Sequence, residues 1–479
     1  MKKLIGAALL ALVAGMAQAQ DTQVALDRID RDAAKNAETA KAIWTLAEVG
    51  YQETKSSALL QKQLKDAGFR IEAGVAGIPT AFTATWGSGG PVIAVLGEFD
   101  ALPGINQSDA PTRDPVAGKG AGHACGHHLF GVASASAAIA VKDWLQKGGH
   151  KGVIRFYGTP AEEGGAGKVY MVRDGLFKDV DIALHWHPGS ENSADIETSN
   201  ANKSGKFRFK GVSAHAAGAP ERGRSALDGV EAMNMMANMM REHLPQESRM
   251  HYVITAGGST PNVVPDYAEV FYYMRNPNPE IVLDSFDRLV KASEGAALGT
   301  GTTVEHEVIH GINSLLPNKY LQNIVHANMT RVGGVTYTAA DTAFAQKILP
   351  SLATKRTLAE ATAIDPLSEN HGAGSTDVGD VSYTVPTAGF STATWVPGTP
   401  AHSWQAVAAG GTPIGFKGMQ NAAKILALTA IELYQNPDHI VAAKAEFDQR
   451  RGPNFVYRSL LGDRKPPLDY RVNKTPGGE

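Results

Sequence analysis

Short apolar segments alternate with helical patterns over the first 190 residues, and this alternation constrains the fold more than any other feature of the chain. Strands are expected at 81–86, 92–96, 152–157 and 181–187, and helices at 24–49, 56–68, 129–145 and 168–174. In a strand–helix–strand unit the helix packs back on the sheet and the two strands run parallel. The alternation therefore predicts an α/β fold in which a mostly parallel, mixed sheet is sandwiched between helices.

The middle of the chain has a different pattern. Residues 203–210 and 267–274 alternate between apolar and polar side chains, as half-exposed antiparallel strands do, and helical patterns occupy 225–242 and 279–298. Because 479 residues also exceed what one hydrophobic core usually holds, we expect an inserted α+β domain. The predicted division is 20–201 and 317–449 for the two parts of the first domain, 202–316 for the inserted domain and 450–479 for a C-terminal extension, an arm or a tail.

The N-terminus has the order of a secretory signal peptide. Lys2 and Lys3 precede an apolar run at 4–14, and Ala17-Gln18-Ala19 supplies small residues for cleavage. We therefore expect residues 1–19 to be removed and the protein to be periplasmic. No later stretch reaches ~18 uninterrupted apolar residues, and the formal net charge is −3, so neither a membrane nor nucleic acid is an expected partner. A small-molecule substrate is the remaining expectation.

Residues 122–128, Gly-His-Ala-Cys-Gly-His-His, contain the only cysteine of the chain. Cys125 therefore cannot form an internal disulfide. It lies in a glycine-rich loop before the helical pattern at 129–145, and both features favour a thiolate. A thiolate is a metal ligand or a nucleophile, whereas an inert buried thiol is the alternative interpretation.

Further polar motifs follow strands, at 97–103, 159–165, 185–188 and 397–404. Open α/β sheets place their sites at the carboxyl ends of strands. Glu162 and Glu163 have no apparent basic partner, so one could bind metal while the other takes a proton from water; a solvated charge pair is the alternative. His185 and His187 lie two apart in a predicted strand, so both face one side, and either could be a ligand.

Together these motifs resemble the amidohydrolase branch of the co-catalytic metallopeptidase superfamily, which includes aminoacylases and glutamate carboxypeptidases. The bacterial aminobenzoyl-glutamate hydrolase-like and hippurate hydrolase-like groups are the most similar. Residues 97–103 resemble the family's Asp-Ala-Leu-Pro box, 123–127 its His-Ala-Cys-Gly-His box and 160–163 its Pro-Ala-Glu-Glu box. The resemblance extends over nearly the whole chain after residue 19, and it implies a catalytic first domain and an inserted ferredoxin-like dimerisation or lid domain.

The resemblance also implies a role for each motif residue. Two divalent ions, Zn²⁺ or Mn²⁺, would be held by Cys125, His127, Glu163, His187 and His402. His187 is preferred to His185 because its spacing from Asp181 matches the family's histidine, although either remains open. Glu162 would be the general base, and Asp100 would orient a ligand from behind.

In the inserted domain, residues 211–216 resemble the family's Ala-His box, whose histidine reaches an active site across a dimer. His215 would therefore help to stabilise the oxyanion in a homodimer. Asn262 and Arg275 resemble the family's grip on a substrate carboxylate, and the planar fork of an arginine suits that task. The implied reaction is metal-dependent hydrolysis of the amide bond of N-acyl or N-aroyl amino acids.

Two other classes of function remain open. A periplasmic metal-binding protein, or a catalytically inactive binding protein on the same scaffold, would need the ligands but not Glu162. A cysteine hydrolase would use Cys125 with His127 or His128, and it would leave the glutamate pair and His402 without a role. The chain has no Gly-x-Ser-x-Gly motif and no predicted helix that carries a His-Glu-x-x-His motif, so the sequence does not support a serine hydrolase or a single-zinc protease.

Overall fold

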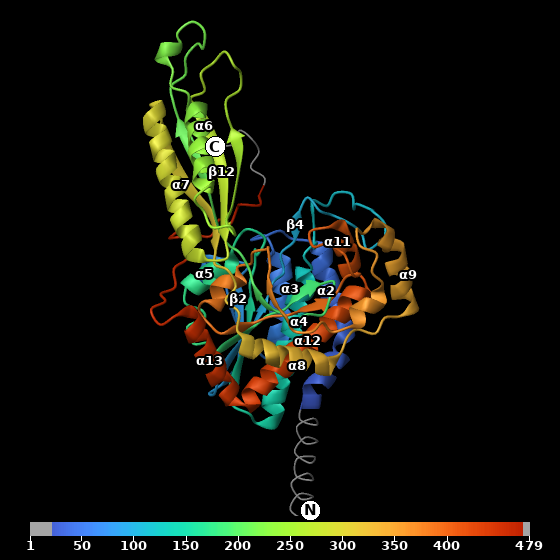
Figure 1. Cartoon of the computed structure of the whole chain (residues 1–479). Helices are drawn as coiled ribbons and strands as arrows, with labels where there is room; N and C mark the ends of the chain where they lie inside the picture. Colours follow the sequence, from blue (N-terminus) through green and yellow to red (C-terminus); the bar gives the residue numbers. More distant parts are fainter. Residues whose placement is uncertain (1–21, 473–479) are drawn as a thin grey trace, which may run out of the picture.

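The computed structural model describes residues 22–472, so the predicted signal peptide at 1–19 and the end of the C-terminal extension lie outside the described residues. The described chain forms two units, each built on its own sheet (Figure 1). No helix within residues 22–472 is both long enough and apolar enough to cross a membrane.

The first unit contains a six-stranded mixed sheet. Its strands, in spatial order, are β1 (Arg70–Ala73), β2 (Phe82–Ser88), β6 (Gly152–Gly158), β3 (Val92–Gly97), β7 (Ile182–Leu184) and β15 (Thr387–Ala388). β6, β3, β7 and β15 run parallel to one another, whereas β2 pairs antiparallel with β6 and with the edge strand β1. The structure thus confirms the expected mixed α/β fold.

Helices cover both faces of this sheet because its central strands are apolar on both sides. On β3, Ile93 and Val95 belong to the core of one face, while Ala94 and Leu96 belong to that of the other. One face carries α2 (Ala33–Leu46), α3 (Thr54–Asp66), α4 (His127–Gly148), α8 (Lys319–Val332), α12 (Pro413–Gln435) and α13 (Pro437–Arg451). The other carries α5 (Gly167–Arg173) and α10 (Val378–Ser382).

Helix α4 is the central helix of the first unit. It is buried along almost its whole length, as expected for a helix that is apolar all round. Its run of alanine and serine residues, 133–138, lets α12, α2 and the sheet approach it closely. Because α4 begins at His127, this packing also holds the histidine in place at the sheet edge.

The second unit follows the predicted pattern of the inserted segment. Its elements are β10 (Ala201–Lys210), α6 (Ala226–Arg241), β11 (Arg249–Ala256), β12 (Tyr267–Asn276), α7 (Pro279–Thr300) and β13 (Thr303–Ile312). The strands form an antiparallel sheet in the order β11-β12-β10-β13. Both helices pack on it through a core that includes Phe207, Tyr272 and Phe286. The unit projects away from the first one (Figure 1).

The remaining elements are short. They are the strands β4 (Leu102–Pro103), β5 (Ala121–Gly122), β8 (His187–Gly189), β9 (Ile196–Thr198), β14 (Glu369–His371) and β16 (Ser391–Ala393), the helices α9 (Ala339–Ile348) and α11 (Trp404–Gly410), and the 3-10 turns Val75–Gly77, Pro220–Arg222, Leu349–Ser351 and Leu358–Thr362. The strand predicted at 181–187 is divided into β7 and β8. Main-chain bonds nevertheless continue across the gap, from the N–H groups of His185 and His187 to the carbonyls of Ala388 and Phe390.

Candidate metal centre

The predicted site residues of the first unit converge at one edge of the six-stranded sheet. β3 and β6 are parallel neighbours, so their carboxyl ends meet at this edge. The loop after β3 carries Asp100, the turn after β6 carries Glu162 and Glu163, and α4 begins beside them at His127. β8 and the loop before α11 add His187 and His402, so all of the residues predicted at strand ends are near one another.

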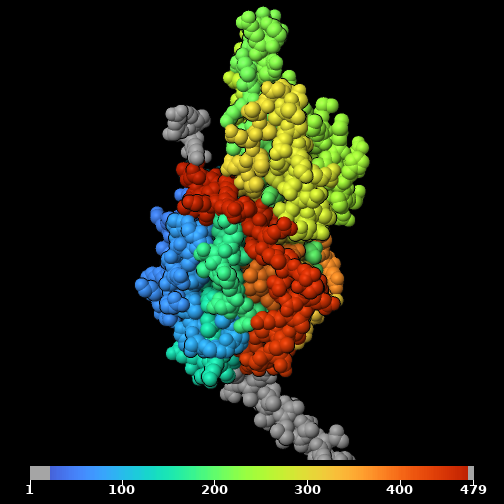
Figure 2. Space-filling model, turned by 90° about the vertical axis from the view of Figure 1, so that its left-hand side faces the viewer, coloured from blue at the N-terminus to red at the C-terminus, as the bar shows by residue number. Residues whose placement is uncertain are grey.

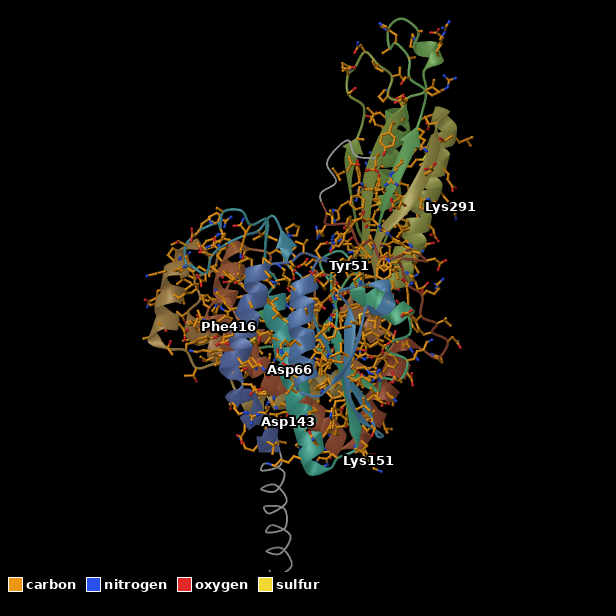
Figure 3. The ribbon with its side chains drawn as sticks, turned by 180° about the vertical axis from the view of Figure 1, so that it is seen from behind. Tyr51, Asp66, Asp143, Lys151, Lys291 and Phe416 are labelled. Atoms are coloured by element: carbon orange, nitrogen blue, oxygen red, sulfur yellow. The ribbon has the colours of Figure 1, made fainter. Side chains whose placement is uncertain are left out.

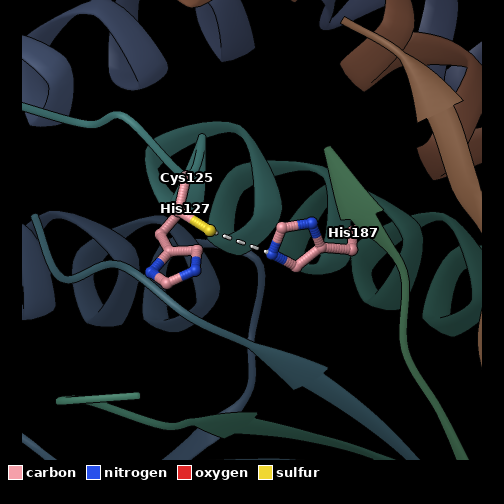
Figure 4. A group of neighbouring side chains, drawn as sticks. All are labelled: Cys125, His127 and His187. Atoms are coloured by element: carbon pink, nitrogen blue, oxygen red, sulfur yellow. Dashed lines mark hydrogen bonds between the residues drawn. The ribbon is translucent and has the colours of Figure 1, made fainter. Parts of the chain in front are cut away.

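Cys125 lies at the centre of this cluster. Its Sγ is 3.4 Å from Nε2 of His187, with the ring of His127 alongside (Figure 4). Two groups of possible ligands share the cysteine: one is completed by His127 and His187, the other by Glu163 and His402. In each group the ligand atoms lie within 4.8 Å of one another. A shared thiol between two ligand sets fits a pair of ions better than a single one.

The chemistry of these atoms fits a divalent metal. Nε2 of His127 is 3.0 Å from Oε2 of Glu98, and Oε1 of Glu163 is 3.0 Å from Nε2 of His402. Even so, the first three of these atoms are buried without a hydrogen-bond partner. Buried polar atoms are costly to leave unpaired, and thiol, imidazole and carboxylate are the donors that zinc and similar ions take.

Asp100 holds two of the possible ligands from behind. Its Oδ1 is 3.0 Å from Nδ1 of His127, and its Oδ2 accepts the main-chain N–H of Glu163 at 3.0 Å. The first contact leaves Nε2 of the histidine free to bind metal. Although burial opposes ionisation, His127 and these hydrogen bonds lower the pKa of Asp100 below its ordinary value.

A buried lysine lies near the glutamates but pairs with two other carboxylates. Nζ of Lys168 is 2.6 Å from Oε1 of Glu98 and 2.6 Å from Oδ1 of Asp377, and its side chain is fully buried. Against the effect of burial, the carboxylates of Asp377, Glu98 and Glu162 raise the pKa of Lys168. Sequence reasoning missed this group because a lysine that opens an apolar helix resembles an ordinary solvent-facing residue.

Glu162 and Glu163 have different surroundings. Burial, together with the carboxylates of Glu98 and Glu163, raises the pKa of Glu162 well above its ordinary value. Glu163 instead faces His402, and its main chain is bonded to Asp100. The surroundings of Glu162 therefore favour its protonated form, while Glu163 is paired with an imidazole.

The pKa of the Cys125 thiol is higher than a predicted thiolate would have. Burial raises its pKa to about 12, against the opposing effect of His127. The predicted thiolate is therefore wrong for the protein without a bound cation, because desolvation outweighs the helix N-terminus. A cysteine hydrolase needs a thiolate near neutral pH, whereas a coordinated metal ion deprotonates a thiol outright. His128 is also turned away, with Nε2 2.9 Å from the carbonyl of Gly410.

His185 and His187 are distinguished by what they contact. His187 lies against Cys125, whereas His185 packs on Gly389. The contact is so close that a Cβ added to Gly389 would lie 2.1 Å from Nε2 of His185. Both line a pocket of about 300 Å³ that also contains Glu191 and Asp195. Burial lowers the pKa of His185 to about 4, so this ring is neutral at pH 7.

The predicted site residues of the second unit do not lie in one place. His215 and Asn262 are in two exposed loops that pair with each other, through the N–H of Ala216 and the carbonyl of Asn262 at 3.0 Å. These loops form the tip of the second unit, farthest from the first (Figure 1). Arg275 lies at the opposite end of β12 from Asn262, beside His310, and its Nε is buried without a partner. One chain therefore does not bring these three residues together.

An open α/β sheet with thiol, imidazole and carboxylate groups at one edge can hold divalent metal where such sheets place their active sites. The chain belongs to the peptidase family M20/M25/M40, whose pattern matches residues 94–407, which confirms the resemblance inferred from the motifs. It is 40% identical over 451 residues to one of the subunits of the p-aminobenzoyl-glutamate hydrolase of Escherichia coli (strain K12), covering 88% of this chain and 94% of the relative.

Two further proteins resemble the chain less closely. A Xaa-Arg dipeptidase of Mus musculus is 28% identical over 439 residues, which covers 88% of this chain and 91% of that protein. The crystal structure of an aminobenzoyl-glutamate utilization protein from Klebsiella pneumoniae matches with a TM-score of 0.62 and 19% identity, over 86% of this chain and 98% of that one. At that identity the structural likeness supports the fold alone.

Proposed function

We propose that this protein hydrolyses the amide bond of N-acyl or N-aroyl amino acids, such as aminobenzoyl-glutamate or hippurate-like compounds, and releases an amino acid and a carboxylic acid. The observation that carries the proposal is the position of Glu162, a carboxylate of raised pKa beside two ligand groups that share Cys125. The similarity to the p-aminobenzoyl-glutamate hydrolase of Escherichia coli supports the same substrate class.

The metal would be Zn²⁺ or Mn²⁺, two ions per chain. The residues that would hold it are Cys125, His127, Glu163, His187 and His402. When bound, such ions activate water and polarise a carbonyl oxygen. The protein keeps the ligands in place: Asp100 fixes His127, and the N–H of His402 donates to the carbonyl of Ala124 at 2.9 Å.

Glu162 performs the proton transfers. It takes a proton from the attacking water as the C–O bond forms, and returns this proton to the leaving amine as the amide C–N bond then breaks. A raised carboxylate pKa suits this exchange, because the group must accept and donate a proton near neutral pH. Lys168 keeps the neighbouring Glu98 ionised, since against the effect of burial it lowers the pKa of that carboxyl.

The substrate carboxylate would be held by Arg275 and Asn262, with His215 at the developing oxyanion. These residues are divided between the two ends of the second unit. Arg275 is near the first unit of its own chain, whereas His215 and Asn262 at the tip are free to reach another molecule. This division supports a shared site, to which a partner contributes the tip residues.

The partner would be a second copy that docks on the second unit, whose β–α–β–β–α–β order and antiparallel sheet suit a ferredoxin-like dimerisation domain. β11 is an edge strand with Val253 54% exposed, and helix α6 of the same unit exposes Met235 and Met239 by about 60%. An apolar edge strand is a template for pairing with another chain. Residues 202–316 would form this domain, and 20–201 with 317–449 the catalytic one.

The proposed compartment is the periplasm, reached through cleavage of residues 1–19. The basic and apolar order of these residues, with the small residues at 17–19, supports this proposal. The N-terminal sequence of the protein recovered from cells would test it. An N-terminus at Gln20 in a periplasmic extract is the expected result, and an intact Met1 would contradict it.

The experiment that tests the function is metal removal followed by reconstitution. We expect the metal-free protein to be inactive on aminobenzoyl-glutamate, hippurate and N-acetyl amino acids, with products followed by mass spectrometry. Zn²⁺ or Mn²⁺ should restore hydrolysis as the content approaches two ions per chain. Full activity without metal would favour the cysteine hydrolase, and full metal content without hydrolysis of any of these compounds would favour a binding protein.

A further inference from the structure

The C-terminal extension is not a free tail. After α13 ends at Arg451, residues 452–472 run over the surface between the two units (Figure 2), and we call them the C-terminal strap. Leu460 is buried in the core of the second unit, and Leu461 in the core of the first. Nζ of Lys203 donates to the carbonyl of Leu460 at 2.8 Å, and Nη1 of Arg173 donates to that of Arg464 at 2.6 Å. The strap is therefore anchored to both units.

The end of the C-terminal strap reaches the candidate metal centre. Oη of Tyr470 and Nη2 of Arg471 both donate to the main-chain carbonyl of Glu163, at 3.0 and 2.6 Å. The ring of Tyr470 meets that of Tyr51 edge to face, with centroids 5.6 Å apart. Gln52 also donates to the carbonyl of Leu468 at 2.8 Å. Tyr51 is at the end of the first unit that faces the second, opposite the end that carries Lys151 (Figure 3).

The turn that receives these bonds has an unfavourable backbone. Ala161 and Ala166 both adopt a φ of 58°, in the left-handed region that alanine rarely occupies. Such conformations persist where the surroundings over-determine them, and they are common at functional sites. The turn is the segment 161–166, which includes both the proposed base and a proposed ligand.

Other bonds to the turn come from the first unit. Oε1 of Glu53 accepts the N–H of Ala161 at 2.9 Å, and Asp100 accepts the N–H of Glu163. The hydroxyl of Tyr51 donates to the carbonyl of Gly165 at 2.7 Å. The C-terminal strap supplies the donors for the carbonyl of Glu163 from a segment about 308 residues later in the chain. Two donors on one carbonyl restrict rotation of the peptide that follows Glu163.

We propose that Tyr470 and Arg471 are positioning residues of the metal centre, which act through the main-chain carbonyl of Glu163. By this contact the C-terminal strap links the docking of the two units to the conformation of the turn 161–166. The role in catalysis rests on the proposed function, whereas the role in ordering the turn does not. Loss of the two donors to the carbonyl of Glu163 should therefore loosen the turn even in protein that holds no metal.

The test is a double variant, Tyr470→Phe with Arg471→Gln, made in the full chain. It removes both donors but keeps the ring of Tyr470 that packs on Tyr51. Amide hydrogen exchange of a peptide spanning 161–166 should accelerate by about tenfold in the metal-free protein. The dissociation constant for Zn²⁺ should rise by about tenfold, and kcat should fall while KM changes little. Tyr470→Phe with Arg471→Lys, which keeps one donor at position 471, should show a smaller change in each of these quantities.

Tyr457→Phe is the matched control. Tyr457 lies elsewhere in the same strap, and its hydroxyl donates to Oδ1 of Asp380 in α10 at 2.7 Å. The control variant should leave exchange at 161–166, Zn²⁺ affinity and kcat unchanged. Unchanged exchange and Zn²⁺ affinity in the double variant would overturn the proposal, and so would equal effects of the control. Faster exchange in a protein that hydrolyses no N-acyl amino acid would support the strap and reject the proposed function instead.

Discussion

At the scale of single residues, the adjacent side chains of Glu162 and Glu163 lie in different environments. Burial and the surrounding carboxylates raise the pKa of Glu162, while Glu163 faces His402 and is bonded through its main chain. Cys125 is desolvated, so its thiol is deprotonated only with the help of a cation. These environments support the proposed proton transfer at Glu162 and the proposed metal binding at Glu163.

The first prediction separates the two glutamates. Glu162→Gln keeps the shape of the side chain but cannot accept a proton, so kcat should fall on the order of 10²–10⁴-fold while metal content is retained. Glu163→Gln should instead lose metal, because an amide is a weaker ligand than a carboxylate. Metal analysis and steady-state rates on the same preparations measure both effects. Near-normal turnover of Glu162→Gln would show that another group is the base.

The second prediction concerns Lys168, whose ammonium group is buried between Glu98 and Asp377. Lys168→Met leaves both carboxylates buried without their cation, which should lower the free energy of unfolding by about 3–5 kcal/mol. Denaturant unfolding measures this loss. The exposed Lys151→Met is the control and should change stability by less than about 0.5 kcal/mol. Similar stability of both variants would mean that the buried ion pairs contribute nothing net.

At the scale of elements, the strand ends were predictable but their partners were not. Apolar periodicity placed β3 and β6, and their parallel pairing brings Asp100 beside Glu163. The structure ends the helical part of the first unit with α12 and α13. It also shows that the C-terminal extension packs as a strap, because Leu460 and Leu461 find cores in two different units. Apolar periodicity predicts the secondary structure of a segment but not the surface on which that segment packs.

The third prediction is an acid sensitivity located at the end of β13. Burial, with the charges of Arg275 and Arg464, lowers the pKa of His310 to about 4. The unfolded chain therefore binds more protons than the folded one between pH 6.5 and 4, and stability is lost as the pH falls through this window. The loss from this group should be at most about 3 kcal/mol.

His310→Gln tests that prediction by urea unfolding at several pH values. The stability difference between the natural protein and this variant should shrink as the pH falls from 7 towards 4. His306→Gln, an exposed position on the same strand, is the control and should show a constant difference. A constant difference for His310→Gln as well would contradict the assignment.

At the scale of the whole molecule, one chain presents an incomplete set of proposed site residues. The ligand groups lie on the first unit, while His215 and Asn262 are exposed at the tip of the second. Apolar side chains of β11 and of α6 are exposed on that unit. Both observations are explained if two chains dock through their second units and exchange tip residues.

The fourth prediction is complementation between two inactive chains. Glu162→Gln and His215→Ala should each be inactive, and a mixture after exchange of chains should regain activity. In a mixed dimer, one site receives an intact glutamate from one chain and an intact histidine from the other. Sedimentation should show a dimer, and Val253→Glu with Met239→Glu should shift it towards monomer. No regain after proven exchange would place His215 outside a shared site.

The sequence by itself determined what depends on short segments. Strand and helix periodicity, the motif around Cys125 and the glutamate pair predicted the α/β fold, the family and which residues converge at the sheet edge. Only the tertiary structure decided the pairing of Lys168 with Glu98 and Asp377, the raised pKa of the thiol and the bonds from Tyr470 and Arg471 to Glu163. The reason is physical: these properties arise from burial and from contacts between distant segments, and a local pattern contains neither.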